Sequence, residues 1–404
     1  MGVKLCISVC LVLILSLEFS VGEDSLCKLS KLDNTCRCEY KTCEVTHFPE
    51  LFADCQWIDL ENLPSHNRFP AELRHLDLSH NNLISLKGSF SSDLLIELDV
   101  SYNKLDFIDY DFFANLRNLK ILNLSHNNLQ KLYAQIFQGL SQLKTIDLSY
   151  NRIINLPDDV FTPLTSLQNL NLGYNDLGDF LEDTNDLFLS DIGLTEKLTT
   201  LNLDKLNLET IRSTFFGDGN NLIRLSMADN LFYDIPLIPR SVTYFDFSGN
   251  NITTLSVNHL NYHSLITLHL NRMKSLEAIE KYALYNMPNL EELYIENCPR
   301  LKELNGLAFG VIRSNPDDIK LRRFSLARSG LQTVNQTYLH LFNKLDYIDL
   351  QNNPFTCDCD ILWMLLLNGS LHKSDNMRCA MPVNLRNKRI MELTAKHLPN
   401  CLLL

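Results

Sequence analysis

Basic residues are scarce in this chain: Lys and Arg number 36 against 48 Asp and Glu, which gives a formal net charge of −12. Proteins that bind nucleic acid present basic surface, because neutralised phosphates release their counterions. The acidic balance also disfavours an anionic membrane surface. After residue 22 no segment is long and apolar enough to span a bilayer. We therefore expect neither a nucleic-acid partner nor insertion into a membrane.

Signatures of catalysis are missing as well. The chain has no G-x-S-x-G, no H-E-x-x-H and no Gly-rich phosphate loop, and its 11 His are scattered without metal-ligand spacing. Residues 183–186 begin like a calcium-binding loop, but Leu187 and the lack of a following Gly break that pattern. The cysteine spacings C-x-C argue against redox catalysis and against a zinc ribbon. We expect no enzyme activity, no metal and no cofactor.

The N-terminus predicts a secretory signal peptide. Lys4 precedes an apolar run over residues 5–17, and small residues follow at 20–22. This order is typical of a signal over residues 1–22, cleaved before Glu23. The run is too short to cross a bilayer, and no anchor-like tail follows Cys401. We therefore expect a secreted, soluble mature chain.

One phrase, L-x-x-L-x-L-x-x-N-x-L, dominates the remainder and recurs at nearly regular intervals. Its copies begin at Leu73, Leu95, Leu119, Leu143, Leu167, Leu198, Leu222, Val242, Leu265, Leu290, Leu321 and Leu345. This is the signature of a leucine-rich repeat, whose units cannot bury their apolar faces alone and must stack. The predicted fold is an α/β leucine-rich-repeat solenoid, a horseshoe with a parallel concave β-sheet, an irregular or 3-10 convex side and disulfide-stapled caps.

The predicted organisation is a signal peptide (1–22), an N-terminal cysteine-rich cap (23–72), the repeat array (73–352) and a C-terminal cysteine-rich cap (353–404). Two repeats, 167–197 and 290–320, are longer than the others. The first carries an acidic insert and the second inserts residues 306–318. We interpret both as irregular insertions, either functional loops or solvated ones.

The ninth position of the repeat predicts a column of buried amides. It is Asn at Asn81, Asn103, Asn127, Asn151, Asn175, Asn230, Asn250 and Asn353. An Asn side chain both donates and accepts, so stacked amides satisfy the backbone groups of a buried turn. The column is interrupted at Leu206, Met273, Cys298 and Ser329, where we expect Cys298 to be a buried structural thiol. Phe113, Phe137, Phe161 and Phe216 predict a second column on the convex side.

The third, fifth, seventh and eighth positions are expected to face outward from the concave sheet. The fifth is often Asp and the eighth often Tyr or His in the first half, and Arg appears at the eighth later. Tyr offers contact area at low entropic cost, which suits a protein ligand; a solvated surface is the alternative. The candidate ligand-binding residues are Asp77, Asp99, Tyr102, Asp147, Tyr150, Tyr174, Arg272 and Arg328.

Cysteines and glycosylation acceptors both point to an oxidising, secretory environment. Outside the signal, the cysteines expected in disulfides are Cys27, Cys36, Cys38, Cys43 and Cys55, followed by Cys357, Cys359, Cys379 and Cys401. Five is an odd number, so one N-terminal thiol is free or tethered to another chain unless Cys298 joins. Acceptor sequons occur at Asn123, Asn251, Asn335 and Asn368.

The C-terminal motif carries a family resemblance. Asn353-Pro354-Phe355-Thr356-Cys357-Asp358-Cys359 is followed by Trp363, Cys379-Ala380-Met381-Pro382 and Cys401. This resembles the C-terminal flanking cap of extracellular leucine-rich-repeat proteins of the Toll-receptor, Slit and chaoptin kind. The resemblance implies the pairs Cys357–Cys379 and Cys359–Cys401, and a cap that covers the last repeat. The N-terminal set departs from the family, where four cysteines are usual.

The family includes pattern-recognition receptors, secreted immune factors, and adhesion and guidance molecules. The chain is also similar to secreted leucine-rich-repeat immune proteins of insects, without their coiled coil. We therefore predict a secreted, glycosylated protein that binds a protein or glycan ligand in innate immune recognition, with a homo- or heterodimer as one possible assembly. The alternatives are adhesion, guidance or receptor–ligand interaction in development, and a structural matrix component.

Overall fold

The computed structural model describes residues 27–28, 35–42, 48–63, 69–183, 188–194, 197–217, 221–310, 319–367, 371–372, 374–394, 396–398 and 401. The proposed signal peptide, Cys43, Asn368 and residues 311–318 of the second insert lie outside this set. The chain divides into two compact units. Unit 1 comprises Met1–Asn202 with Thr214–Asn220, and unit 2 comprises Leu203–Ser213 with Asn221–Leu404. Within the described residues, no helix combines the length and apolarity needed to cross a membrane.

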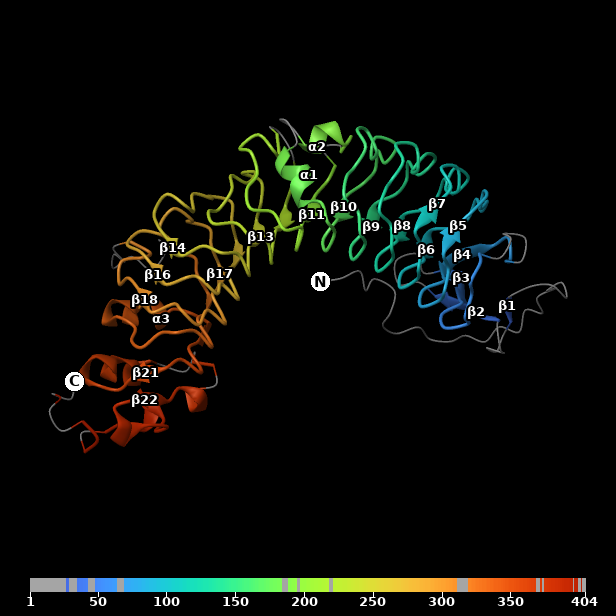
Figure 1. Cartoon of the computed structure of the whole chain (residues 1–404). Helices are drawn as coiled ribbons and strands as arrows, with labels where there is room; N and C mark the ends of the chain where they lie inside the picture. Colours follow the sequence, from blue (N-terminus) through green and yellow to red (C-terminus); the bar gives the residue numbers. More distant parts are fainter. Residues whose placement is uncertain are drawn as a thin grey trace. The chain divides into compact units, whose positions relative to one another are not determined.

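The sheet of unit 1 consists of strands from the N-terminal cap followed by one short strand from each repeat (Figure 1). They are β1 (Cys27–Lys28), β2 (Cys36–Thr42), β3 (Pro49–Asp54), β4 (Leu73–Asp77), β6 (Glu97–Asp99), β8 (Ile121–Asn123), β9 (Thr145–Asp147), β10 (Asn169–Asn171) and β11 (Thr200–Asn202). β2 and β3 pair antiparallel, and every pair from β3 to β11 is parallel. We call this face of a unit the sheet side and the opposite face the outer side.

The register places the fourth residue of each repeat opposite its counterpart. Leu98 pairs with Leu122, which pairs with Ile146. In the repeat from Leu119, the apolar residues Leu119, Leu122, Leu124 and Leu129 are all buried. Because alternate residues of a strand face opposite sides, the fourth and sixth positions enter the core while the fifth stays on the sheet side. The predicted leucine-rich-repeat solenoid is confirmed.

The outer side of unit 1 consists of turns and two short paired strands, β5 (Ser85–Leu86) and β7 (Phe107–Ile108). Beneath them Phe113 stacks on Phe137, and Phe137 on Phe161, with ring centroids 6.4 and 5.8 Å apart. This confirms the predicted Phe column through those three members. These three buried rings occupy the same position in three successive repeats, where they pack the repeats against one another.

The first insert is not irregular throughout, contrary to the prediction. It forms two short helices, α1 (Gly178–Asp183) and α2 (Phe188–Asp191). Leu181, Leu189 and Ile192 are buried although the segment is rich in acidic residues. Leu181 lies in α1 and Leu189 in α2, so each short helix of this acidic segment buries an apolar side chain.

Unit 2 repeats the same plan. Its sheet side consists of β12 (Arg224–Ser226), β13 (Tyr244–Asp246), β15 (Thr267–His269), β17 (Glu292–Tyr294), β19 (Arg323–Ser325) and β20 (Tyr347–Asp349), all parallel. The outer side carries a second parallel ladder of β14 (Thr254–Leu255), β16 (Ala278–Ile279) and β18 (Glu303–Leu304). The next repeat replaces that strand with the 3-10 helix η3 (Gln336–Tyr338), followed by α3 (Leu339–Phe342).

The C-terminal cap of unit 2 covers its last repeat. It contains β21 (Phe355–Thr356), β22 (Cys379–Met381) and the 3-10 helices η4 (Cys359–Leu366), η5 (Ser374–Asn376), η6 (Val383–Leu385) and η7 (Ile390–Glu392). Disulfides join Cys357 to Cys379 and Cys359 to Cys401, the pairs that the resemblance implies. Trp363 is buried, and its Nε1 donates to the Val334 carbonyl at 3.0 Å. The indole thereby seals an apolar end that would otherwise meet water.

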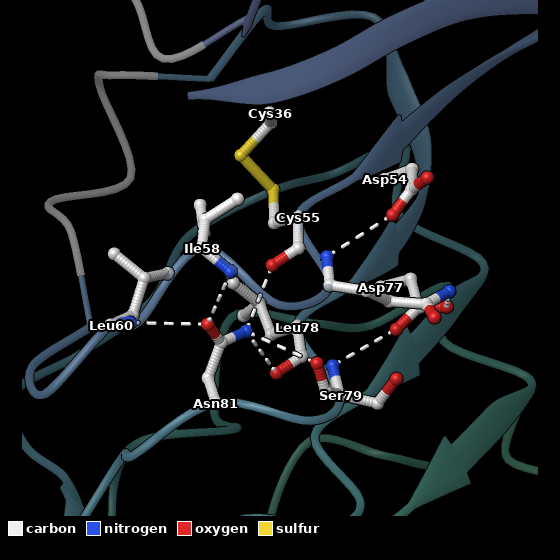
Figure 2. The surroundings of a disulfide bond; sticks show 10 residues. Cys36, Asp54, Cys55, Ile58, Leu60, Asp77, Leu78, Ser79 and Asn81 are labelled. Atoms are coloured by element: carbon white, nitrogen blue, oxygen red, sulfur yellow. Dashed lines mark hydrogen bonds between the residues drawn. A yellow bond between two sulfur atoms is a disulfide. The ribbon is translucent and has the colours of Figure 1, made fainter. Parts of the chain in front are cut away.

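The N-terminal cap is joined to the array by the amide column (Figure 2). Cys36 is disulfide-bonded to Cys55, and Cys38 is also disulfide-bonded. The Oδ1 of Asn81 accepts from the Ile58 and Leu60 N–H groups, and its Nδ2 donates to the Cys55 carbonyl at 2.8 Å. The first Asn of the column therefore ties the turn after the disulfide to the first repeat.

The amide column continues as predicted, and at two of its interruptions, Cys298 and Ser329, the side chain donates to backbone carbonyls in place of the amide. Asn103, Asn127, Asn151 and Asn175 each donate to carbonyls of their own and the preceding repeat. Cys298 is buried, and its thiol donates to the Leu270 and Glu296 carbonyls at 3.5 Å. Burial raises the pKa of the Cys298 thiol to about 11, which keeps it protonated and able to donate. The predicted structural thiol is confirmed.

Candidate ligand-binding surfaces

A column of stacked rings runs along the sheet side of unit 1, at the eighth position of the repeats and the matching residue of the cap. We call it the aromatic ladder, and its members are Trp57, His80, Tyr102, His126, Tyr150 and Tyr174. Consecutive ring centroids lie 4.0–4.3 Å apart, with interplanar angles of 10–13°. The three predicted tyrosines are thus brought together, with two histidines and a tryptophan interleaved among them.

The backbone of the repeat turn spaces these rings. All six residues have a left-handed φ of 52–58°. Arg272 and Arg328 adopt the same conformation at the same position of unit 2, so it is a property of the turn rather than of the aromatic residues. The N–H groups of His80 and Tyr102 donate to carbonyls of the following repeat at 3.1 Å. These bonds hold neighbouring turns close to strand spacing, which suits face-to-face stacking.

Because the rings of the aromatic ladder stack face to face, their edges are the parts that a ligand can contact. Tyr102 is 47% exposed and Tyr150 is 42% exposed, whereas Trp57, which begins the described column, is 70% exposed. Both faces of Tyr102 are covered by His80 and His126. A ligand on this surface would therefore meet hydroxyl groups and ring edges, which favour directional polar contacts.

The fifth-position carboxylates shape the turn. Oδ1 of Asp77, Asp99 and Asp147 accepts from the N–H two residues later, at 2.8–2.9 Å. The second oxygens of Asp99 and Asp147 accept from the neighbouring strand: Asn123 donates to Asp99 at 2.9 Å and Asn171 donates to Asp147 at 3.1 Å. Burial raises the pKa of Asp99, while its hydrogen bonds to Ser101 act in the opposite direction. These candidates are half-buried, so a ligand reaches them only in part.

One expectation about this surface is wrong. The seventh position does not face outward: Ser79, Ser101, Ser125 and Ser149 are buried, because the turn closes over them once the Asp or Asn two residues earlier binds their N–H. Asn123, the acceptor of one sequon, occupies the fifth position of its repeat and is hydrogen-bonded on the sheet side. Its Nδ2 donates to Asp99 and its Oδ1 accepts from the Ser125 N–H.

The predicted arginines of unit 2 are engaged in ion pairs. Arg272 Nη2 lies 2.8 Å from Asp229 Oδ2, and Arg328 Nη2 lies 2.9 Å from Glu296 Oε2. Arg328 also donates through Nε to Asn297 at 2.8 Å. The basic residues at the eighth position are thus offset by acidic groups on the sheet side, which lowers the net positive charge offered to a ligand.

A cluster of arginine, tyrosine and histidine side chains on the sheet side of unit 2 was not predicted from the sequence. We call it the Arg–Tyr–His row: Arg224, Tyr244, His269, Tyr294, Arg323 and Tyr347. The Arg224 guanidinium lies 3.8 Å from the centre of the Tyr244 ring. The His269 ring lies 5.3 Å from Tyr244 and 4.7 Å from Tyr294, measured between centroids. Arg323 donates from Nε to the Tyr294 hydroxyl at 3.2 Å.

The row ends on Tyr347, whose ring centre lies 4.9 Å from the Arg323 guanidinium. Both arginines are exposed, and the aromatic members are half-buried. Burial raises the pKa of Tyr244 and lowers the pKa of His269, which favours the neutral form of each ring. Neutral rings beside exposed guanidinium groups form a surface of mixed apolar and cationic character.

Part of this row could have been recognised in the sequence, because four of its members occupy the third position of the repeat: Arg224, Tyr244, Arg323 and Tyr347. Each belongs to a different repeat, so the sequence alone does not make them neighbours. The parallel register, which pairs Arg224 with Tyr244 and Arg323 with Tyr347, brings them side by side. Among the described residues, no group of three or more His, Cys, Asp or Glu is placed to hold a metal ion.

Known protein families match both units. Residues 71–129, 93–153 and 117–177 match the family described as "Leucine rich repeat". Residues 226–353 match "BspA type Leucine rich repeat region (6 copies)". These segments together make up more than half of the chain. The chain belongs to the leucine-rich-repeat proteins.

Individual relatives are more distant. Toll-like receptor 7 of Drosophila melanogaster is 26% identical over 175 residues, which cover 40% of this chain and 12% of that protein. A chain of the mouse RP105/MD-1 complex aligns with a TM-score of 0.62 and 20% identity, covering 85% of this chain and 53% of that one. A chain of the Toll–Spatzle complex of Drosophila aligns with a TM-score of 0.55 and 19% identity, covering 86% and 55%. The chain thus spans only part of these relatives, and the structural likeness concerns the fold.

Proposed function

We propose that this chain is a secreted, glycosylated leucine-rich-repeat protein that binds a protein ligand through its sheet side, in innate immune recognition. The Arg–Tyr–His row carries the proposal. Tyr and Arg dominate the binding energy of protein interfaces, because both offer large contact area and directional bonding. A guanidinium held against an aromatic face also loses little freedom when a partner covers it.

The charge around the row favours a protein over a polyanion. Glu292 lies 3.8 Å from Arg323, and Glu296 pairs with Arg328 on the neighbouring turn. Nucleic acid would meet these carboxylates as repulsive groups. A protein epitope that carries both signs of charge can pair with these carboxylates and with the arginines. A glycan ligand is the alternative, and a binding assay distinguishes it from a protein.

Secretion and glycosylation rest on the proposed signal at 1–22 and on disulfides in both caps. Disulfides such as Cys36–Cys55 and Cys359–Cys401 persist in oxidising compartments. Two of the structural relatives are protein–protein complexes, RP105 with MD-1 and Toll with Spatzle. They support a protein partner, and a homo- or heterodimer is part of the same proposal.

A second candidate is receptor–ligand interaction or adhesion in development. The Toll–Spatzle complex is described as a hub of both development and innate immunity, so that likeness favours neither role alone. Immune recognition predicts transcript induction on microbial challenge and binding to microbial surfaces. Steady, cell-type-restricted expression with a cell-surface partner would support the developmental role instead, and retention in insoluble matrix would support a structural one.

The binding proposal is tested with the secreted protein and a partner found by proximity labelling. In Arg224→Ala/Arg323→Ala we expect the affinity to fall about 30- to 1000-fold, since each hot-spot side chain contributes on the order of 1–2 kcal/mol and about 1.4 kcal/mol corresponds to a tenfold change. Arg152→Ala, an exposed arginine of unit 1 outside the aromatic ladder, is the matched control. Unchanged affinity in a correctly folded double variant would exclude the Arg–Tyr–His row as the binding surface.

A further inference from the structure

A pocket on the outer side of unit 2 lies where the outer strand ladder stops. It has a volume of about 530 Å³ and is bordered by Lys302, Glu303 and Asn305 of the β18 segment and by Asn335 of the next repeat. Trp363 and Asp360 of the C-terminal cap complete its lining. The pocket therefore occupies the place where a further strand would pair with β18.

β18 presents an unpaired backbone edge to this pocket. The Glu303 and Asn305 N–H groups donate to the Glu277 and Ile279 carbonyls of the preceding repeat, at 3.2 and 2.9 Å. Peptide groups alternate in direction along a strand, so the N–H and carbonyl of Leu304 face the opposite way, toward the pocket. The Leu304 N–H has no acceptor among the described residues.

The next repeat cannot cover this edge. The Val334 carbonyl accepts from Trp363, and Asn335 caps η3 by accepting from the Thr337 N–H at 3.0 Å. The Tyr338 hydroxyl donates to the Asn305 carbonyl at 2.6 Å. The segment therefore forms the helix η3 instead of a strand, and among the described residues no strand of this repeat pairs with β18. An edge left open in this way is a site for unwanted strand pairing.

Asn335 stands at the rim of the pocket with its amide nitrogen unused. Asn335 is exposed, and among the described residues its Nδ2 makes no hydrogen bond, while Oδ1 is held by the Thr337 N–H. The Thr337 hydroxyl, which completes the sequon, donates to the Gly306 carbonyl at 2.9 Å. By contrast, Nδ2 of Asn123 donates to Asp99 and Nδ2 of Asn251 donates to the Leu231 carbonyl.

We propose that Asn335 carries an N-linked glycan whose first sugars occupy this pocket and accept a hydrogen bond from the Leu304 N–H. In the transfer, Asn335 Nδ2 bonds to the anomeric carbon of N-acetylglucosamine and loses a proton. The bond from that carbon to a lipid-linked pyrophosphate breaks, and the lipid pyrophosphate leaves. The proposal rests on the proposed function only for entry into the secretory pathway, which supplies the lipid-linked donor.

Tethering favours the glycan over an added peptide strand as the occupant. A sugar attached at the rim has a high effective concentration in the pocket, whereas a peptide must bind from solution. The lining also offers Lys302, Glu303 and Asp360, whose charged groups suit hydroxyl and acetamide partners. The bound sugars would cover the open edge of β18 without continuing the sheet.

The test variant is Gln336→Pro, because a proline between Asn and Thr abolishes the acceptor. Gln336 is the first residue of η3, where proline is tolerated, and Asn335 has φ −67° and ψ 140°, which a residue before proline adopts readily. Both Asn335 and Thr337 remain, so their hydrogen bonds are kept. Wild-type protein stripped by a peptide–glycan amidase is the second comparison and does not depend on how the variant folds.

The protein is expressed through the secretory pathway of a eukaryotic cell, without ligand, and analysed by glycopeptide mass spectrometry and amide hydrogen exchange. We expect Asn335 to be occupied and Leu304 to exchange roughly five- to tenfold more slowly than in Gln336→Pro or in stripped protein, as one added hydrogen bond implies. An unoccupied Asn335 beside other occupied sequons, or equal Leu304 exchange in all forms, would overturn the proposal. Occupancy at no sequon would instead contradict the proposed secretion as well.

Discussion

Tyr102 lies in the middle of the aromatic ladder, and its replacement by Ala gives the sharpest test of what the ladder does. Its ring lies 4.3 Å from His80 and 4.0 Å from His126, nearly parallel to both. Stacked aromatic pairs contribute about 0.5–1.5 kcal/mol each beyond their buried area. Losing both contacts in Tyr102→Ala is therefore expected to lower the free energy of unfolding by about 1–3 kcal/mol.

The backbone conformation of residue 102 makes a second contribution to stability, which a glycine variant separates from the loss of the ring. Tyr102 has φ 52°, a conformation that costs an L residue about 1–2 kcal/mol but costs glycine almost nothing. Tyr102→Gly should therefore be more stable than Tyr102→Ala by on the order of 1 kcal/mol, although both lose the ring. Tyr102→Phe keeps both stacks and is expected to resemble the wild type.

The assay is urea unfolding followed by circular dichroism, with Tyr110→Ala as the control. Tyr110 is an exposed tyrosine with no ring contact among the described residues, so its removal should change stability by less than about 0.5 kcal/mol. A double-mutant cycle between Tyr102→Ala and His126→Ala isolates their stack. A coupling energy near zero, or a Gly variant less stable than the Ala variant, would refute the reasoning.

Three further predictions concern buried and titrating groups. Asn127→Leu should lower the free energy of unfolding by about 1–3 kcal/mol, because it removes the one acceptor that the described residues offer to the buried Leu105 N–H, while the carbonyls that Asn127 serves keep other donors. Asn128→Leu is the control in urea unfolding, and equal effects would contradict the role of the column. Burial lowers the pKa of His126, so stability should fall as the pH drops below about 6.5 toward the lower folded pKa, and His126→Phe should flatten that part of the curve of melting temperature against pH. Cys298, with a pKa of about 11, should resist alkylation at pH 8 in the folded protein and react after unfolding; mass spectrometry that finds it labelled in native protein would show the thiol to be accessible.

Much of the fold could be predicted because each repeat is a local unit. The spacing of Leu119, Leu122, Leu124 and Leu129 specifies which residues enter the core, and the stack then follows from their need for burial. The amide column and the Cys298 substitution follow from the same turn. The pairs Cys357–Cys379 and Cys359–Cys401 came from family resemblance rather than from spacing.

The sheet-side surfaces were predicted less well. The eighth-position tyrosines were found, but their stacking on His80 and His126 was not, since a repeat pattern does not state ring orientation. Ser101 was expected outside and is buried, because the Asp99 carboxylate closes the turn over it. The helices of the first insert were hidden by its acidic composition.

The sequence by itself determined the repeat, the inward residues, the caps and the positions available for a ligand, because these depend on short-range periodicity within a single repeat. Only the tertiary structure decided which side chains became neighbours. The Arg–Tyr–His row, the aromatic ladder and the pocket beside Asn335 all join residues of different repeats, whose contacts depend on strand register and turn geometry. Stacking the repeats places residues from the same position of the pattern side by side on one surface. The backbone hydrogen bonds that hold them there join different repeats, so no single repeat contains them.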